Sequence, residues 1–499
     1  MLKKLRVALA VLFWLGITLL LLDFTGVLHH YLGWMAKIQF LPAVLALNVG
    51  VIVGLVLLTL VFGRVYCSII CPLGVFQDAV SHLGTRGKKQ PYHHKKEHPW
   101  LRYGVWALFV VALVAGVQAL LALLAPYSAY GRMVQNLLQP VYLWGNNLLA
   151  TLAERAGSYT FYEKEVWMRS LPTFIIAVVT LVIVVALSFK GGRTYCNSIC
   201  PVGTTLSFFS RFAMFRPVID TEKCKHCKAC EHHCKASCIA IGKESAQIDY
   251  SRCVDCFNCI GACKFDALKY RFAWGKKKET AQADNGRRAF MTGTAVALGA
   301  AALKGVEARA QEIAKKTDGG FARVLPKQAP EREVPLTPPG SRSVKDFYRH
   351  CTGCQLCVAE CPNNVLRPST DLEHLMQPQM SYEKGFCRPE CTRCSELCPA
   401  GAIEKITREE KTQYHIGTAQ VNPELCLMAT GKSACGKCSQ ACPSGAINLV
   451  AYGENRIPAI AEEVCTGCGA CEYLCPVRPI SAITVNGKYQ HIDSSLRSE

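Results

Sequence analysis

The sequence has no C-x-x-C-H motif, so covalently attached haem is not expected, and it has no flavin-attachment motif. Acidic residues are few, with 37 Asp and Glu against 56 Lys and Arg, which gives a formal net charge of +19. Four long runs before residue 190 are nearly free of charge of either sign. The missing C-x-x-C-H motif excludes a c-type cytochrome. The residue that stands out instead is cysteine, with 29 copies.

Most of the cysteines fall into six groups of four, each spaced like half of a two-cluster bacterial ferredoxin. In that spacing three cysteines bind one cluster and the fourth binds the neighbouring cluster. The sequence therefore predicts six [4Fe-4S] clusters. The six groups are Cys224, Cys227, Cys230 and Cys234; Cys253, Cys256, Cys259 and Cys263; Cys351, Cys354, Cys357 and Cys361; Cys387, Cys391, Cys394 and Cys398; Cys426, Cys435, Cys438 and Cys442; and Cys465, Cys468, Cys471 and Cys475.

Two other uses of cysteine compete with this interpretation, a disulfide framework and a set of zinc knuckles. Disulfide frameworks suit small secreted domains that lack a core, and zinc sites usually combine separated C-x2-C pairs. Neither use explains the proline that follows each of the last four groups. In the first two groups Lys235 and Lys264 replace that proline, and Cys238 is a spare cysteine that we interpret as a buried small side chain.

The uncharged runs predict four membrane helices, since each is about long enough to cross a hydrocarbon layer of roughly 30 Å. Basic residues near the N-terminus and after the second run predict that these ends face the cytoplasm. Each oxidised cluster with four thiolates would carry roughly −2, which offsets most of the positive charge. We therefore expect contact with the lipid bilayer and no nucleic-acid partner. The predicted helices are Leu5–Leu22, Leu41–Phe62, Tyr103–Leu124 and Leu171–Phe189.

A short repeat follows two of these runs, GRVYCSIICPLG at 63–74 and GRTYCNSICPVG at 192–203. Because each copy follows the second helix of a hairpin, both copies are expected at the cytoplasmic face. Two C-x3-C pairs can supply four ligands to one further metal centre or can form redox-active thiols, while buried structural cysteines are the plain alternative. The four residues of this quartet are Cys67, Cys71, Cys196 and Cys200.

A segment in the middle of the chain has the layout of a twin-arginine export signal. Arg287 and Arg288 precede a mildly apolar run at 292–303, and Ala308 and Ala310 could allow cleavage. An amphipathic linker helix is the alternative, and an uncleaved signal would act as a fifth membrane helix. The signal predicts a periplasmic C-terminal part, while the N-terminus and the first ferredoxin part stay cytoplasmic.

These observations predict an α-helical membrane domain of four or five spanning helices combined with α+β ferredoxin-like modules. Within the first module, the spacing predicts that Cys263 joins the first group's cluster and Cys234 joins the second. The expected domains are 1–215 for the membrane domain, 216–275 for a two-cluster ferredoxin, 276–310 for the signal, 311–343 for a proline-rich linker and 344–499 for a four-cluster polyferredoxin.

The repeated C-x3-C-P motif and the two-cluster ferredoxin after it resemble the NapH type of membrane quinol dehydrogenase subunit. The chain from the twin arginines onward resembles exported polyferredoxins of the NapG and MauM type, including the lead-in at 338–340. The whole chain resembles a fusion of the two in a bacterial cytoplasmic membrane. This resemblance implies that menaquinol or ubiquinol from the quinone pool is oxidised in an anaerobic respiratory chain. Electrons would pass through the clusters to a periplasmic cytochrome or reductase.

The similarity to four-cluster subunits of anaerobic reductases further implies nested pairing of the last four groups, although pairing of adjacent groups stays open. Quinol needs hydrogen-bond partners at a membrane interface, and four polar residues follow the third run. They are Tyr127, Tyr130, Arg132 and Asn136, and ordinary interfacial anchoring is the alternative role. Two other functions compete: a copper reductase for oxidase assembly, and a quinone-independent relay between a cytoplasmic donor and a periplasmic partner.

Overall fold

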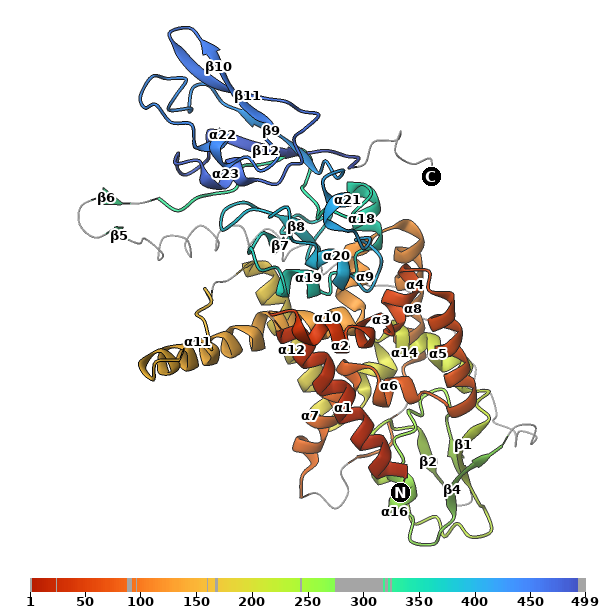
Figure 1. The fold of residues 1–499 in the computed structure, drawn as a ribbon. Helices are drawn as coiled ribbons and strands as arrows, with labels where there is room; N and C mark the ends of the chain where they lie inside the picture. Colours follow the sequence, from red (N-terminus) through yellow and green to blue (C-terminus); the bar gives the residue numbers. More distant parts are fainter. Residues whose placement is uncertain are drawn as a thin grey trace.

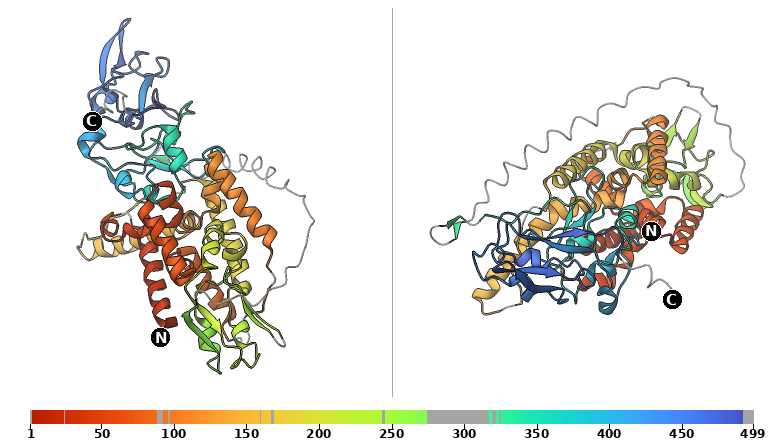
Figure 2. Two further views of the ribbon diagram at one scale, coloured as in Figure 1. Left: turned by 90° about the vertical axis from the view of Figure 1, so that its right-hand side faces the viewer. Right: turned by 90° about the horizontal axis from the view of Figure 1, so that it is seen from above.

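The computed structural model describes residues 2–23, 25–87, 92–95, 97–158, 160–166, 169–242, 245–273, 317–318, 322–323 and 325–491. A helical domain (residues 2–210) lies between two cysteine-rich modules (Figure 1). The first module (215–273) lies at the end where the chain begins, and the second module (325–491) lies at the opposite end, as the left view of Figure 2 also shows. The twin-arginine segment falls outside the described residues.

The helical domain is built from long apolar helices joined by short helical turns. Its long elements are α1 (Leu2–Leu22), α5 (Val49–Phe62), α7 (Pro72–Thr85), α8 (Pro99–Ala115), α11 (Gln139–Arg155), α12 (Leu171–Gly191) and α14 (Pro201–Ser210). Its short elements are α2 (Val27–Leu32), α3 (Trp34–Lys37), α4 (Phe40–Leu45), α6 (Val65–Ile69), α9 (Gln118–Leu124), α10 (Pro126–Met133), the π-helix η1 (Val134–Leu138) and α13 (Thr194–Ser198).

Two helices, α1 and α12, are long and apolar enough to cross a membrane, with 21 residues each. The two other predicted spans are interrupted. Residues 41–62 divide into α4 and α5 because Leu47 has a positive φ of 51°, and residues 103–124 divide into α8 and α9 because Gly116 ends α8 in the left-handed conformation. At 14 residues, α5 is about 21 Å long, which is short of a full hydrocarbon layer of roughly 30 Å.

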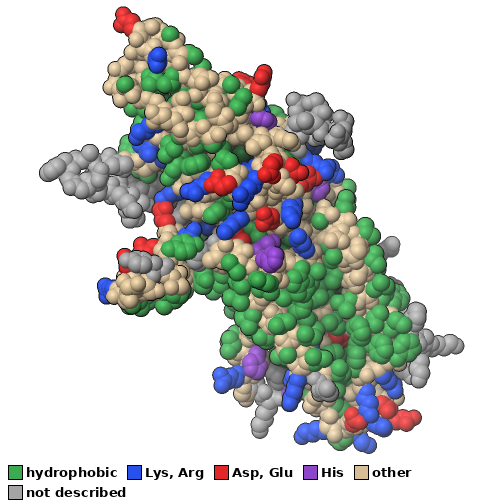
Figure 3. All heavy atoms as spheres, viewed as in Figure 1, with side chains coloured by type: hydrophobic (Ala, Val, Ile, Leu, Met, Phe, Trp, Pro, Cys, Tyr) green, Lys and Arg blue, Asp and Glu red, His purple; other side chains and the backbone are tan. Residues whose placement is uncertain are grey.

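The surface of the helical domain is apolar where its long helices face outward. Exposed Leu and Val side chains repeat along α1, α5, α8 and α12. On the face shown in Figure 3 they form a broad hydrophobic zone between two groups of charged side chains, one toward the second module and one beside the first module. Such a large exposed apolar zone indicates contact with lipid or with another protein.

The first module has two antiparallel strand pairs and two one-turn helices. Strand β1 (Phe215–Ile219) pairs with β4 (Leu268–Phe272), and β2 (Ile239–Ile241) pairs with β3 (Ala246–Ile248). The apolar run at 239–241 therefore starts a short hairpin. Helix α15 (Ala229–His232) packs against α16 (Asn258–Ala262), which brings the two cysteine groups together.

The second module has three antiparallel strand pairs and six short helices, and its second half repeats the arrangement of the first module. Its helices are α18 (Val344–His350), α19 (Leu356–Ala359), α20 (Arg393–Leu397), α21 (Arg408–Lys411), α22 (Lys437–Ala441) and α23 (Ala470–Leu474). Strands β7 (Leu366–Pro368) and β8 (Pro378–Met380) pair, as do β9 (Gly417–Val421) with β12 (Ile483–Gly487) and β10 (Ile447–Tyr452) with β11 (Asn455–Ile460). The pair β5 (Thr317–Asp318) and β6 (Ala322–Arg323) precedes the module.

Candidate iron-sulfur and redox sites

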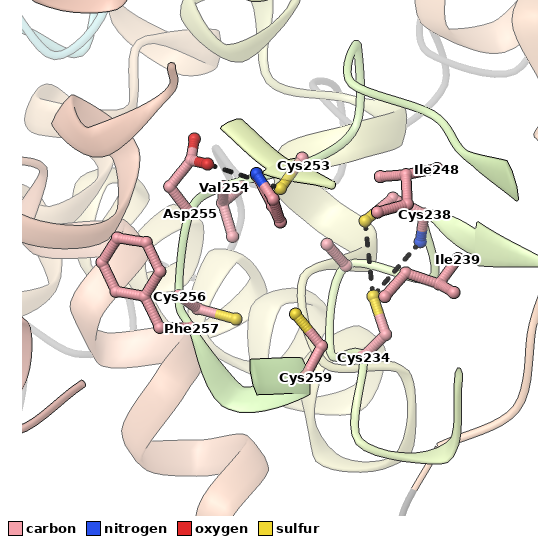
Figure 4. A pocket seen from close by; sticks show the side chains of 12 residues that line it. Cys234, Cys238, Ile239, Ile248, Cys253, Val254, Asp255, Cys256, Phe257 and Cys259 are labelled. Carbon is pink, nitrogen blue, oxygen red and sulfur yellow. Dashed lines mark hydrogen bonds between the residues drawn. The ribbon is translucent and has the colours of Figure 1, made fainter. Parts of the chain in front are cut away.

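The first module has two cavities lined by cysteine sulfurs from both of its cysteine groups. One cavity is lined by Cys253, Cys256 and Cys259 together with Cys234, and Figure 4 shows these side chains around it. The other is lined by Cys224, Cys227 and Cys230 together with Cys263. This exchange of the fourth cysteine is the arrangement expected of a two-cluster ferredoxin. The residues thus fit two [4Fe-4S] clusters.

The loops that carry these cysteines share an unusual backbone conformation. His226, Lys228, Asp255 and Phe257 all have φ between 50° and 60°, although none is glycine. The second module repeats the pattern at Gly353, Gln355, Gly467 and Gly469. A left-handed residue costs energy unless the surroundings enforce it, and such residues gather at functional sites. Here the two left-handed residues turn each C-x2-C-x2-C loop around the position that its three sulfurs share.

The cysteine thiols are free and largely buried. All 29 cysteines are unpaired, so the structure contains no disulfide framework. Burial raises the pKa of Cys230 and of Cys354 to about 11 in each case. Such thiols stay protonated at neutral pH until a metal displaces the proton, which couples cluster binding to proton release.

In the second module, adjacent cysteine groups pair, and the nested pairing implied by the reductase subunits is wrong. Cys475 joins Cys426, Cys435 and Cys438 around one cavity. Cys398 interacts electrostatically with the group of Cys351, and Cys361 interacts with the group of Cys387. The physical reason is local packing. Helix α19 packs against α20 and α22 packs against α23, so the two cysteine groups within each half of the module lie together.

Replacing Cys475 with Ser tests this pairing. We expect the substitution to disturb the cluster held by the Cys426 group and to leave the cluster of the Cys351 group intact, because Cys475 lines only the former cavity among those described. Iron content and electron paramagnetic resonance (EPR) spectra of the purified variant would be measured. Loss of the signal that Cys351→Ser also removes would support nested pairing instead.

The two halves of the second module meet at two cysteines from different halves. The backbone N–H of Cys387 donates a hydrogen bond of 2.9 Å to the carbonyl oxygen of Cys468. A cavity of about 450 Å³ opens beside these two residues and is also lined by Lys411, His415 and Glu463. The chain therefore brings the two halves into direct contact at ligand residues.

The quartet is brought together from both repeats in the interior of the helical domain. Cys67, Cys71, Cys196 and Cys200 are each 4% exposed, and Cys200 interacts electrostatically with the three others. In the part of the chain that the structure describes, no three Cys, His, Asp or Glu side chains lie close enough together to hold a single metal ion. A cubane needs wider spacing, because each of its four irons takes one thiolate.

The quartet lies where the first module joins the helical domain, and its place at the cytoplasmic face stays a prediction. On one side of it, Arg64 donates a 3.0 Å hydrogen bond to the carbonyl oxygen of Ser251 in the first module. On the other side, the hydroxyl of Tyr66 donates to Gln39, which lies between α3 and α4.

Each repeat sends its arginine into the other repeat. Arg64 lies beside Gly203, and Arg193 lies beside Gly74, so that a Cβ atom on either glycine would come within 2.7 Å of a guanidinium nitrogen. The two guanidinium groups also approach sulfurs, at 3.8 Å for Cys67 and 3.9 Å for Cys196. Both arginines are fully buried. Two cations beside four thiols would stabilise a negatively charged centre.

A buried carboxylate connects the quartet with the first module. Asp78 accepts from Arg193 at 2.6 Å, from Arg6 at 2.8 Å and from Lys235 at 2.5 Å. Burial lowers the pKa of Lys235, and Asp78 opposes that shift. The lysine that stands in place of the ferredoxin proline therefore has a docking role. The sequence showed the repeated arginines, but nothing in it pointed to Asp78 as their partner.

The structure places the predicted quinol residues on α10 and η1, between the quartet and the second module. Gly131 packs so closely against the Cys354 carbonyl oxygen that a Cβ atom there would lie 2.5 Å from it. Asn136 donates to the Gln355 side chain at 3.3 Å, and Arg132 donates to the carbonyl oxygens of Ala122 and Leu123. The hydroxyl groups of Tyr130 and Thr18 share a 2.6 Å hydrogen bond. A π-helix such as η1 often marks a functional site.

Several polar atoms around α10 are buried without a hydrogen-bond partner, and sequence reasoning missed all but Tyr127 and Arg132. They are the Tyr127 and Ser128 hydroxyls, the Arg132 Nε, the Gln118 and Gln135 amide oxygens and the Gln139 amide nitrogen. Glu360 of the second module is likewise buried with both oxygens unpartnered, and burial raises its pKa to about 8. Buried polar groups without partners are rare, so each calls for an explanation.

Comparisons with protein families and with relatives also indicate iron-sulfur sites in this chain. A model described as a 4Fe-4S binding domain matches residues 44–91 and 173–218, which contain the quartet, and a 4Fe-4S dicluster domain matches 386–446 and 433–478. The ferredoxin-type protein MauM of Methylobacillus flagellatus is 32% identical over 31% of this chain and 70% of its own length. The chain belongs to the family of ferredoxin-type proteins.

Other ferredoxin-type proteins also match part of the chain. NapF of Escherichia coli strain K12 is 30% identical over 30% of this chain and 84% of NapF, and NapG is 29% identical over 39% of this chain and 84% of NapG. This ferredoxin-type protein is an iron-sulfur electron-transfer protein. The expected likeness to NapG and MauM is confirmed, while the likeness of the helical half to NapH stays a prediction.

Proposed function

We propose that this ferredoxin-type protein oxidises menaquinol or ubiquinol at α10 and passes the electrons through the second module to a periplasmic cytochrome or anaerobic reductase. Oxidation of one quinol yields a quinone, two electrons and two protons. The electrons leave one at a time, and the protons leave to the water at the outer face.

The observation that carries this proposal is the set of unpartnered buried polar atoms beside the Cys354 backbone. A quinol has two hydroxyl groups that need hydrogen-bond partners in a largely apolar setting. The Tyr127 and Ser128 hydroxyls and the Gln135 amide oxygen have no hydrogen-bond partner in the protein. Tyr127 also interacts electrostatically with Cys354 and Cys398, so the same side chain would adjoin both the quinol and a cluster.

The residues around α10 would bind and orient the quinol, and the clusters would supply one-electron acceptors. Arg132 is fixed by the carbonyl oxygens at the end of α9, so its position is set before a ligand binds. Asn136 ties η1 to Gln355 and thereby fixes the second module against α10. A fixed arrangement of donors around the substrate lowers the cost of reaching the reactive geometry.

Four membrane crossings, by α1, by α4 together with α5, by α8 together with α9, and by α12, form part of this proposal. The first module ends at Ala273 at one end of the helical domain, and the second module begins at Leu325 at the other end. If the helical domain lies in a membrane, the intervening chain crosses it once more. That crossing supports an uncleaved twin-arginine segment, a cytoplasmic first module and a periplasmic second module.

Tyr127→Phe tests the quinol site. Loss of one hydrogen bond of about 0.5–1.5 kcal/mol predicts an approximately two- to twelvefold slower reduction of the clusters by a limiting menaquinol analogue. The rate would be followed by the loss of iron-sulfur absorbance in stopped flow. Tyr31→Phe is the matched control, because Tyr31 is 68% exposed at the surface. Equal rates for the two variants would place quinol oxidation elsewhere.

A further inference from the structure

The first module is docked directly on the two segments that carry the quartet. The Arg193 N–H donates to the Lys235 carbonyl oxygen at 2.8 Å, and the Asn197 amide donates to the Ala236 carbonyl oxygen at 3.0 Å. Lys235 follows Cys234, which lines the cavity of Cys253, Cys256 and Cys259. Only a few residues, joined by peptide bonds and hydrogen bonds, therefore separate one cluster site of the first module from the quartet.

Residues next to the quartet in turn contact α10, the helix on which the second module packs. Tyr195, the residue before Cys196, interacts electrostatically with Arg132 of α10. The ring of Phe76, on α7, lies with its centroid 6.4 Å from that of Tyr130. Helix α10 then packs on Cys354 through Gly131. A single buried core contains residues from all three parts, including Cys256, Cys71, Cys200 and Cys354.

The surroundings of the quartet suit a buried anionic centre. Gln77 donates to the Cys196 sulfur at 3.2 Å, and the Gly203 N–H donates to the Cys200 sulfur at 3.4 Å. Among the described residues, the donors directed at these sulfurs, including Arg64 and Arg193, come from the two repeats and from Gln77 on α7. Hydrogen bonds to cluster sulfurs and nearby positive charge raise a cluster's reduction potential.

We infer that Cys67, Cys71, Cys196 and Cys200 hold a redox-active iron-sulfur cluster inside the helical domain, and that it connects the two modules so that single electrons cross the membrane through the protein. A low-potential electron-carrier protein at the cytoplasmic face is oxidised by one electron, and a cluster of the second module is reduced by one. No bond is made or broken and no proton moves. This inference rests on the part of the proposed function that places the modules on opposite faces, and it does not need quinol.

The test uses the full-length protein in vesicles of quinone-free lipid that enclose ferricytochrome c. A reduced ferredoxin is added outside, because neither protein can cross the lipid. We expect wild-type vesicles to reduce the enclosed cytochrome, and vesicles with Cys67→Ser and Cys196→Ser to do so no faster than protein-free vesicles. The double variant should also lose about four irons per chain while the EPR signals of the other clusters persist. Ser68→Ala is the matched control, because the Ser68 hydroxyl donates to the Val65 carbonyl oxygen.

Each outcome decides the question. Wild-type vesicles that leave the cytochrome oxidised, although both modules are reducible in detergent, would overturn the inference, as would a double variant with unchanged iron. If the double variant fails to fold, Gln77→Leu should shift the reduction potential of one EPR signal only. Unchanged reduction potentials of all the signals would overturn the inference. Reduction of the second module by quinol in detergent is measured separately. A failure of the proposed function can therefore be told apart from a failure of this inference.

Discussion

Replacing Asp78 with Asn should destabilise the protein by about 3–5 kcal/mol, which is the usual cost of removing one partner from a buried ion pair. Asp78 is in contact with three buried cations, Arg6, Arg193 and Lys235. Asparagine has almost the same shape, so packing stays while the neutralising charge is lost. The free energy of unfolding would be measured in mixed detergent micelles by titration with a denaturing detergent.

Asp266→Asn is the matched control for Asp78→Asn. Asp266 also pairs with a lysine, Lys269, at 2.7 Å, but both side chains are more than half exposed. An exposed pair contributes about 0–1 kcal/mol, so this change should be almost neutral. Equal effects of the two substitutions would show that the Asp78 network does not hold the first module to the helical domain.

Gly131→Ala should loosen the second module from the helical domain by about 1–3 kcal/mol, the range for inserting an extra methyl group into a packed contact. The added Cβ atom would lie 2.5 Å from a backbone oxygen of Cys354, which cannot yield as a flexible side chain would. A loss of that size shifts the ratio of docked to undocked modules about five- to 150-fold. Hydrogen exchange of backbone amides at 353–360 would report the change.

Gly145→Ala provides the comparison for Gly131→Ala. It adds the same methyl group to a helix of the same domain, with no atom within 4 Å of the new Cβ. Exchange at 353–360 should then match that of the wild type. If both variants exchange alike, the contact at Gly131 does not fix the second module.

The cysteine spacing was sufficient to predict the ligand exchange in the first module. The motif predicts that Cys234 and Cys263 exchange clusters, and each of the two lines the cavity of the other cysteine group. The spacing did not determine which groups pair in the second module, because four groups in one chain can pair in more than one way. Packing of α19 on α20 and of α22 on α23, which depends on the intervening strands, decided between the alternatives.

The predicted helices were less well determined than the cysteine sites. Hydrophobicity identified α1 and α12, but Leu47 and Gly116 break the other two runs, and a single left-handed residue leaves almost no signal in an average over twenty. The quartet was found from the repeated Cys and Arg, yet its depth was not. Its burial depends on contacts such as those of Arg64 with Ser251 and of Tyr66 with Gln39, which join residues far apart in the sequence.

The measurement that tests the proposed function most directly is anaerobic addition of a menaquinol analogue to the purified protein, followed by EPR. We predict that cluster signals of the second module appear within seconds and are weakened in Tyr127→Phe. Absence of any signal in protein whose clusters dithionite does reduce would contradict quinol oxidation. It would leave an electron relay supplied by a protein partner.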